Sequence, residues 1–213
     1  MSKRLYYITD ALCGWCYGFG PVIKQFVAKY GDELTVRVVA GGMITGQRIG
    51  PIGEVAPYIK EAHKTVEQRC GVTFGDKFLN DVLEEGSTVF TSVPPAVALA
   101  AFRSLAPDHQ VAFAGDQQTA IYYDGADPAD FTAYADYAVN YGVDRAAFLA
   151  ACAGEDARRD AERDFAMTAQ LGVSGFPTVL VVVGDQPYVI GRGYLPLEAL
   201  EANYRQVAEL ANT

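Results

Sequence analysis

The stretch Asp10-Ala11-Leu12-Cys13-Gly14-Trp15-Cys16 decides the fold that we expect for this chain. It follows Leu5-Tyr6-Tyr7-Ile8, a short aromatic and β-branched run that is typical of a strand. After it, apolar residues recur at helical spacing as far as Gly31, on a face formed by Val22, Ile23, Phe26, Val27 and Tyr30. Pro21 lies inside that pattern, so we expect a kink or a delayed start of the helix. The sequence therefore places Cys13 at the N-terminus of a helix, with Cys16 one turn further in.

A second strand is predicted at Leu34–Ala40, which gives the order strand, C-x-x-C, helix, strand. In this context a C-x-x-C pair is typical of thioredoxin-like redox centres. Unpaired backbone N–H groups and the positive end of the helix dipole favour thiolate over thiol at the first cysteine. We therefore predict that Cys13 is the nucleophile, and that Cys16, deeper in the helix, closes a disulfide with it.

A second diagnostic stretch, Val173-Ser174-Gly175-Phe176-Pro177-Thr178, precedes the β-branched run Val179–Val183. Proline cannot donate to a strand ladder, and its cis form costs far less than that of other residues. We therefore predict a cis turn at Pro177, where a strand begins, against the alternative of an ordinary loop proline. Such a turn would leave the backbone of Phe176 free to pair with an extended peptide.

Two further elements are predicted near the end of the chain. A strand at Tyr188–Ile190 follows a turn at Gly184–Pro187. The last helix begins near Pro196, which suits a first turn. Its buried stripe comprises Leu197, Leu200, Tyr204, Val207 and Leu210 or Ala211.

The long central segment between Gly50 and Gly172 has helical periodicity, broken by Gly and Pro. We predict helices at about 55–70, 75–84, 93–105, 109–123, 129–141, 144–153 and 155–171. The expected fold class is α/β: a thioredoxin-like mixed sheet with a large all-helical insertion between its second and third strands. Residues 1–50 and 171–213 would form a discontinuous thioredoxin-like domain, and residues 51–170 an insertion domain that caps one side of the cysteine site.

These elements resemble the thioredoxin superfamily and, because of the long central segment, its DsbA-like branch. Within that branch the chain is similar to the FrnE-like group of cytoplasmic proteins, often described as predicted protein disulfide isomerases. The resemblance rests on four stretches, Asp10–Phe19, Gly41-Gly42-Met43, Thr91–Ala96 and Val173–Thr178. The chain departs from DsbA itself, which is exported and has a different dipeptide between its cysteines, so the oxidising strength of DsbA is not carried over.

The resemblance implies a protein-disulfide oxidoreductase or isomerase, with Cys13 and Cys16 as catalytic residues. Its expected substrates are disulfide-containing proteins or peptides, with small thiols as further partners. Phe176 and Pro177 would hold the substrate backbone, and Gly14 and Trp15 would lie beside the reactive sulfur, although plain packing explains Trp15 equally well. We expect no bound cofactor; glutathione is a candidate redox partner. The sequence does not set the direction of electron flow or the oligomeric state.

Net charge and the lengths of the apolar runs exclude further classes of partner and location. A net charge of −9 over 213 residues argues against nucleic acid and anionic membrane surfaces, which both require a basic face. Met1-Ser2-Lys3-Arg4 leads straight into a strand without the apolar core of a signal peptide, and no run reaches the length of a membrane span. We therefore expect a cytoplasmic protein, in which thiols stay reduced and a C-x-x-C is more often catalytic or metal-binding than structural.

We assign no catalytic or metal-binding role to the remaining cysteines and the histidines. Cys70 and Cys152 are isolated in helical, apolar surroundings, so we interpret them as buried small hydrophobes rather than as ligands of a metal or partners in a disulfide. His63 lies on a Lys- and Glu-rich helix and His109 at a helix start, so both are predicted at the surface. Hydrolytic chemistry has no support in this pattern.

Two other function classes compete with dithiol exchange. Glutathione-dependent transferases of the kappa class and chromene-carboxylate isomerases share this fold with a similar helical insertion, but they typically lack a second cysteine at the place of Cys16. A non-enzymatic binding module would leave the two thiols at redox spacing unexplained. We therefore favour dithiol exchange at Cys13 and Cys16.

Overall fold

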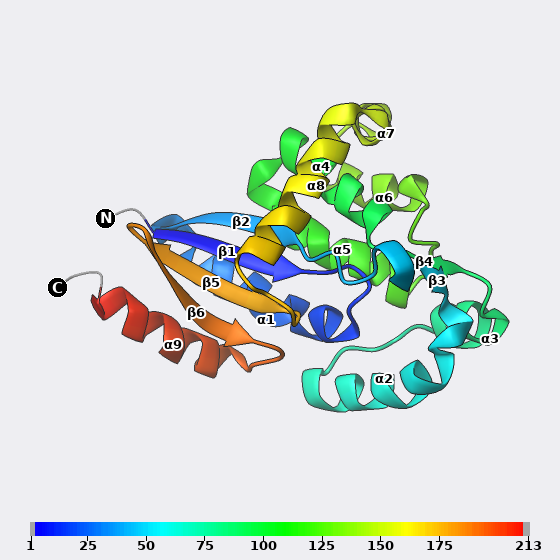
Figure 1. Cartoon of the computed structure of the whole chain (residues 1–213), viewed down its shortest axis with the longest axis horizontal. Coiled ribbons are helices and arrows are strands. Elements are labelled where there is room, and N and C mark those ends of the chain that lie inside the picture. Colours follow the sequence, from blue (N-terminus) through cyan, green and yellow to red (C-terminus); the bar gives the residue numbers. More distant parts are fainter. Residues whose placement is uncertain (1–2, 211–213) are drawn as a thin grey trace.

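A mixed β-sheet forms the centre of the computed structural model, which describes residues 3–210 (Figure 1). Its strands lie in the order β2-β1-β5-β6. β1 and β2 are parallel, whereas β5 pairs antiparallel with β1 and β6 antiparallel with β5. Their bounds are β1 (Lys3–Thr9), β2 (Leu34–Ala40), β5 (Thr178–Val183) and β6 (Gln186–Arg192). The mixed sheet predicted from the sequence is confirmed.

Helices cover both faces of this sheet (Figure 1). They are α1 (Gly14–Tyr30), α8 (Glu155–Gln170) and α9 (Leu197–Leu210). Successive side chains of a strand point to opposite faces, so Leu5, Tyr7 and Thr9 of β1 share the face toward α1. Ile8 lies on the other face, in a cluster with Met167 of α8. The C-terminal part of β1 is buried on both faces because helices cover both sides of the sheet there.

α1 begins at Gly14, so the predicted delayed start at Pro21 is wrong. The helix starts early because its N-terminus is capped: the Cys16 N–H donates to the Cys13 Sγ, and the Cys13 N–H donates to the Asp10 carbonyl. Pro21 lies within the helix, and a kink there stays a prediction. In α9, Leu200, Tyr204 and Val207 are buried as predicted; the side chain of Leu210 and residue Ala211 lie outside the described part.

Most of the segment between β2 and β5 is helical, as predicted. Its elements are β3 (Gly50–Pro51), α2 (Ala56–Cys70), a π-helical turn (Lys77–Val82), α3 (Leu83–Glu85), β4 (Val89–Phe90), α4 (Val93–Leu105), α5 (Gln110–Tyr122), α6 (Phe131–Ala138), α7 (Arg145–Ala153) and α8. The short 3-10 turns are Gly31–Glu33, Gly46–Arg48, Ile52–Glu54, Pro107–His109 and Val139–Tyr141. Two features differ from expectation: a π-helical turn stands where a regular helix was predicted, and β3 pairs with β4.

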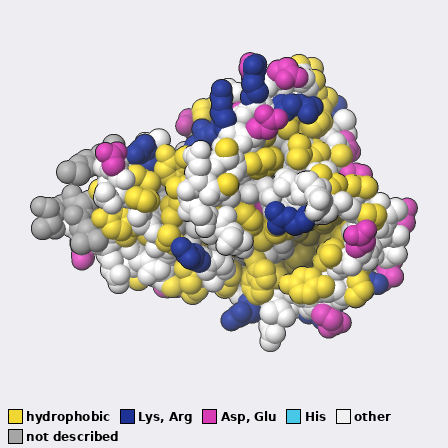
Figure 2. Space-filling model, in the orientation of Figure 1, with side chains coloured by type: hydrophobic (Ala, Val, Ile, Leu, Met, Phe, Trp, Pro, Cys, Tyr) yellow, Lys and Arg dark blue, Asp and Glu magenta, His cyan; other side chains and the backbone are white. Residues whose placement is uncertain are grey.

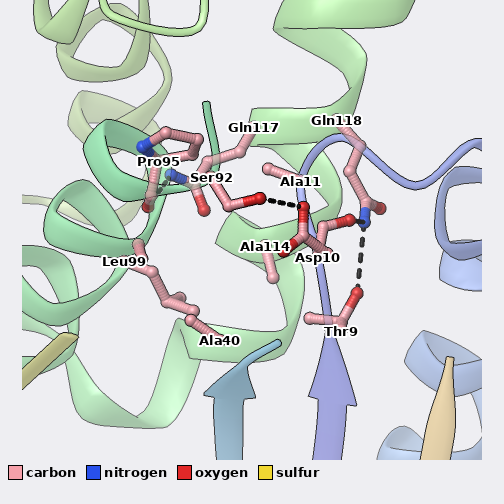
Figure 3. A pocket seen from close by; sticks show the side chains of 11 residues that line it. Thr9, Asp10, Ala11, Ala40, Ser92, Pro95, Leu99, Ala114, Gln117 and Gln118 are labelled. Carbon is pink, nitrogen blue, oxygen red and sulfur yellow. Dashed lines mark hydrogen bonds between the residues drawn. The ribbon is translucent and has the colours of Figure 1, made fainter. Parts of the chain in front are cut away.

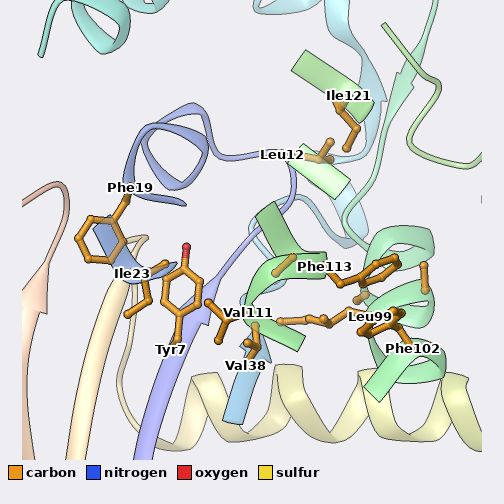
Figure 4. Close-up of a cluster of buried hydrophobic side chains, with 14 of the residues drawn as sticks. Tyr7, Leu12, Phe19, Ile23, Val38, Leu99, Phe102, Val111, Phe113 and Ile121 are labelled. Carbon is orange, nitrogen blue, oxygen red and sulfur yellow. The ribbon is translucent and has the colours of Figure 1, made fainter. Parts of the chain in front are cut away.

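The insertion and the sheet share one apolar core. Figure 4 shows Tyr7, Phe19 and Ile23 of β1 and α1 at one end of a cluster of buried residues and Phe102 and Phe113 of α4 and α5 at the other, with Val38 and Val111 between them. The rings of Phe102 and Phe113 stack with their centroids 3.9 Å apart. The insertion is therefore packed on the sheet as expected, while the boundaries at residues 50 and 171 stay a prediction.

A buried ion-pair network anchors α8 to the edge of the sheet. Asp164, which is 1% exposed, accepts the Ala40 N–H of β2 at 3.1 Å. It also pairs with Arg37 of β2 at 2.8 Å and with Arg103 of α4 at 3.1 Å. One carboxylate thus joins α8, α4 and β2. No helix among residues 3–210 is long and apolar enough to cross a membrane.

Candidate active site

Cys13 occupies the N-cap of α1. Its backbone is extended, with φ of −99° and ψ of 108°. Its Sγ accepts the Cys16 N–H at 3.3 Å, and its carbonyl accepts the N–H groups of Cys16 and Tyr17. The sulfur therefore lies at the positive end of the helix, where backbone N–H groups favour an anion. This is the placement predicted from the C-x-x-C spacing.

Cys16 lies beneath Cys13 and is fully buried, and both thiols are free. Burial raises the pKa of Cys16 well above its ordinary value, and the neighbouring Cys13 raises it further. Cys13 retains 6% exposure. Of the two cysteines, only Cys13 therefore keeps any exposure to an incoming molecule.

The Phe176–Pro177 peptide bond is cis, as predicted. The Cys13 thiol donates to the Phe176 carbonyl, with Sγ and O 3.6 Å apart. The Phe176 ring lies on Gly41, where a Cβ would approach it to 2.4 Å. The backbone of Phe176 is thus only partly free: its carbonyl faces Cys13, and its N–H has no hydrogen-bond partner in the described chain.

Asp10 joins the loops that surround the two thiols. It is 3% exposed, and its carboxylate accepts the Leu12 N–H at 3.0 Å, the Met43 N–H at 2.8 Å and the Ser92 hydroxyl at 2.9 Å. Burial raises the pKa of Asp10, and these hydrogen bonds oppose that rise. Figure 3 shows Ser92 donating to Asp10 in the lining of a small pocket. Three stretches with separate motifs therefore meet at one side chain.

An apolar cavity of about 270 Å³ opens beside Cys13. Figure 2 shows hydrophobic side chains gathered in a hollow of this face. We call it the Cys13 cavity; its lining comprises Leu12, Cys13, Gly14, Trp15, Met43, Ile44, Val55, Tyr58, Ile59, Ala62, His63, Val66, Phe74, Phe90 and Tyr122. Nine of these, from Val55 onward, belong to the insertion, which therefore walls one side of the site as expected.

Comparison with known proteins gives the family. A family model described as a DSBA-like thioredoxin domain matches residues 6–205. The chain belongs to the DSBA-like family. No curated protein sequence matches it significantly.

Solved structures resemble this DSBA-like chain over its whole length. A candidate protein disulfide isomerase from Nitrosomonas europaea has a TM-score of 0.87 at 27% identity, covering 99% of both chains. The cytosolic disulfide reductase DsbM from Pseudomonas aeruginosa has a TM-score of 0.79 at 27% identity, covering 99% and 100% of the two chains. DsbM with GSH gives 0.76, covering 97% and 98%. A 2-hydroxychromene-2-carboxylate isomerase is 18% identical with a TM-score of 0.63, covering 97% and 95%, and shows the fold alone.

Two of the four residues predicted to bind substrate line the Cys13 cavity. Gly14 and Trp15 line it, and Trp15 is half-buried with the Arg69 guanidinium 5.9 Å from its ring centroid. Phe176 borders Cys13 through its carbonyl, and Pro177 follows it in the cis peptide bond. The structure therefore brings Gly14, Trp15 and the Phe176 carbonyl near the Cys13 sulfur, whereas Pro177 is placed through its bond to Phe176.

His63 is not the surface residue that the sequence predicted. It is half-buried, its ring lies 5.7 Å from that of Phe74, and its Nδ1 lies 3.1 Å from the Ile59 carbonyl. Its spacing from Ile59 and Val66 places it on the apolar face of α2, a signal masked by the charged residues around it. His109 is exposed as predicted.

The other two cysteines of the DSBA-like chain differ in burial. Cys152 is buried, which raises its pKa to about 12, in agreement with the prediction of a small core residue. Cys70 is only half-buried, with a pKa raised to about 11 by partial burial. It lies against α1, since a Cβ at Gly18 would approach the Cys70 Sγ to 2.6 Å. Within residues 3–210, no group of three or more His, Cys, Asp or Glu side chains could hold a metal ion.

Proposed function

We propose that this protein is a cytoplasmic thiol–disulfide oxidoreductase that exchanges disulfides with proteins or peptides through Cys13 and Cys16. The observation that carries the proposal is the pairing of two unlike thiols. Cys13 caps a helix and lines the Cys13 cavity, and the fully buried Cys16 donates its N–H to the Cys13 sulfur at 3.3 Å. One thiol is placed to attack and the other to close the ring.

The exchange has two steps. The Cys13 thiolate attacks one sulfur of the substrate disulfide, the S–S bond breaks, and the departing substrate sulfur leaves as a thiolate that takes a proton. Cys16 then loses its proton and attacks the Cys13 sulfur, which releases the second substrate sulfur. The substrate gains two electrons, and the protein is left with a Cys13–Cys16 disulfide. A reducing thiol such as glutathione restores the dithiol, and oxidation of a substrate follows the same steps in reverse.

The surroundings of Cys13 favour a peptide substrate. The unpartnered Phe176 N–H can donate a strand-like hydrogen bond to a carbonyl of an extended substrate backbone, while the Cys13 cavity offers apolar contacts for a neighbouring side chain. Similarity to a cytosolic disulfide reductase supports the cytoplasmic location, and the GSH complex of that protein supports glutathione as redox partner.

Single-cysteine variants test the proposal. Reduced protein is mixed with a disulfide-linked peptide, and its adducts are identified by mass spectrometry. We expect Cys16→Ser to accumulate a mixed disulfide on Cys13 and Cys13→Ser to form none. Cys70→Ser and Cys152→Ser are matched controls that keep turnover. Full turnover by Cys16→Ser with glutathione as the only thiol would instead favour a glutathione-dependent isomerase. Full activity of Cys13→Ser would show that Cys13 is not needed and would favour a non-enzymatic binding module.

A further inference from the structure

The second step of the proposed exchange depends on the groups around Cys16, because they determine how readily its thiol ionises. This thiol is fully buried, and burial opposes its ionisation. Yet a buried thiol must become a thiolate before it can attack the Cys13 sulfur. The inference below rests on the proposed function, because it concerns how that anion is stabilised.

Two hydroxyl groups of β1 lie on the face that packs against α1. Tyr7 is 2% exposed and Thr9 is 3% exposed, so both hydroxyls are enclosed in the core. Figure 4 shows the Tyr7 hydroxyl directed toward α1, and within residues 3–210 it has no hydrogen-bond partner. Burial raises the pKa of Tyr7, and the neighbouring Cys16 raises it further. A buried donor without a partner therefore faces α1, the helix whose first turn holds the buried Cys16 thiol.

Gln118 determines the orientation of the Thr9 hydroxyl. The Gln118 Nε2 donates to the Thr9 Oγ1 at 3.2 Å and to the Asp10 carbonyl at 3.2 Å (Figure 3). Because the Thr9 oxygen accepts from this amide, its own proton is available to another acceptor. The Thr9 hydroxyl lowers the pKa of Cys16, as a donor to the thiolate does. A side chain of the insertion thus occupies the Thr9 oxygen as an acceptor and leaves the Thr9 proton for an acceptor on the face of β1 that packs against α1, the helix that carries Cys16.

We propose that Thr9, oriented by Gln118, is a positioning residue for the resolving thiol: its hydroxyl donates a hydrogen bond to the Cys16 thiolate during attack on Cys13. Tyr7 supplies the second donor. The Cys16 electron pair forms the bond to the Cys13 sulfur, and the bond from Cys13 to the substrate sulfur breaks. The proton lost by Cys16 is balanced by the proton that the departing thiolate takes from water. Neither hydroxyl is consumed.

A two-phase reaction separates this role from the first attack. Reduced protein, with Cys70 and Cys152 both replaced by Ser, is mixed with 5,5′-dithiobis(2-nitrobenzoate). The first thionitrobenzoate released reports attack by Cys13, and the second reports resolution by Cys16. We expect Thr9→Val to slow the second phase by about tenfold and to leave the first unchanged, because a hydrogen bond to a charged group is lost.

The pH dependence of the second-phase rate tests whether Thr9 stabilises the Cys16 thiolate or only supports the fold. In Thr9→Val, the rise of the second phase with pH should move to higher pH, whereas Thr9→Ser, which keeps the hydroxyl, should restore the wild-type profile. Cys13, Asp10, Tyr7 and Tyr122 also interact electrostatically around this thiol and are unchanged in both variants. Thr168→Val is the matched control, since its buried hydroxyl donates to the Ala40 carbonyl instead.

The kinetics of Thr9→Val, of Tyr7→Phe and of the parent protein each support or contradict the proposal. Tyr7→Phe removes a hydroxyl without a partner and should fold, so a slower second phase in this variant supports the donor pair even if Thr9→Val is unstable. Wild-type rates and pH profiles in Thr9→Val and Tyr7→Phe would overturn the inference and leave dithiol exchange intact. Absence of any second phase in the parent protein would overturn both, because Cys16 would not resolve.

Discussion

The Cys13 sulfur lies 3.6 Å from the Phe176 carbonyl oxygen, although 163 residues separate the two in the chain. The position of Phe176 depends on Gly41 at the end of β2, because its ring covers the Cα of that glycine. The loop before β5 therefore borders the Cys13 thiol through a close approach that only a residue without a Cβ permits.

Gly41→Ala should displace the Phe176 loop. The new Cβ would lie 2.4 Å from the Phe176 ring, so the ring must move, and we expect a loss of about 1–3 kcal/mol in the free energy of unfolding. Alkylation of Cys13 should also change in rate, because its thiol loses its acceptor. Gly175→Ala is the control, since a Cβ there meets no described atom within 4 Å. Equal stability and equal alkylation rates in both variants would contradict this account.

Asp164→Ala should destabilise the attachment of the insertion. It removes the acceptor for the Ala40 N–H and leaves the buried Arg103 with only Asp160 as an acidic partner. Breaking a buried ion pair costs about 3–5 kcal/mol, so we expect a loss of about 3 kcal/mol in urea unfolding. Asp156→Ala is the control, because its ion pair with Arg159 is fully exposed on the aspartate side and should change stability by less than about 0.5 kcal/mol. Similar losses in the two variants would refute the anchoring role.

Stability of the reduced protein should fall in alkaline solution. The pKa of Cys16 is raised by burial, so the unfolded chain loses this proton at lower pH than the folded protein does. The stabilisation from the neutral thiol is therefore complete below about pH 8.5 and is lost as pH rises toward the folded-state pKa. The contribution changes by at most about 1.4 kcal/mol per pH unit.

Urea unfolding with reductant at pH 7.5, 8.5 and 9.5 measures that contribution. Cys16→Ala lacks this thiol but keeps Cys70 and Cys152, whose pKa values of about 11 and about 12 also make stability fall with pH. We expect a steeper loss in the wild-type protein than in Cys16→Ala. Parallel losses would show that Cys16 does not titrate differently on folding.

A charge in the Cys13 cavity should weaken peptide substrates selectively. Val55 lines this cavity and is 47% exposed, so Val55→Asp adds a carboxylate with little cost to folding. We expect kcat/KM for a disulfide peptide with a large apolar residue beside its cysteine to fall about tenfold, the equivalent of about 1.4 kcal/mol of apolar contact. Val139→Asp is the matched control at 45% exposure, outside the cavity. Equal kinetics for the two variants would remove the cavity from substrate binding.

The sequence predicted the parts of the site that depend on local pattern. Strand and helix periodicities placed Cys13 at a helix N-terminus, and the proline before a β-branched run indicated the cis peptide bond at Pro177. The resemblance named Gly41-Gly42-Met43 and Thr91–Ala96 without assigning them a role. In the structure these two stretches supply the Met43 N–H and the Ser92 hydroxyl that donate to Asp10. Three chain segments meet at that side chain, and no local pattern encodes such a meeting.

Other features were missed because their signals are weak or non-local. β3 and β4 are two residues long, too short to show alternation. The π-helical turn has the composition of an ordinary helix. His63 was assigned to the surface from the charges of its helix, although its spacing from Ile59 and Val66 favoured the buried face. The pairing of Gln118 with Thr9 joins residues 109 positions apart and required the structure.

The redox equilibrium of Cys13 and Cys16 tests the central claim most directly. Purified protein is equilibrated with a series of reduced and oxidised glutathione mixtures, then alkylated and mapped by mass spectrometry. The account predicts a reversible two-electron transition confined to Cys13 and Cys16, with Cys70 and Cys152 remaining thiols throughout. A stable glutathione adduct on Cys13 alone, or the absence of any Cys13–Cys16 disulfide, would contradict dithiol exchange.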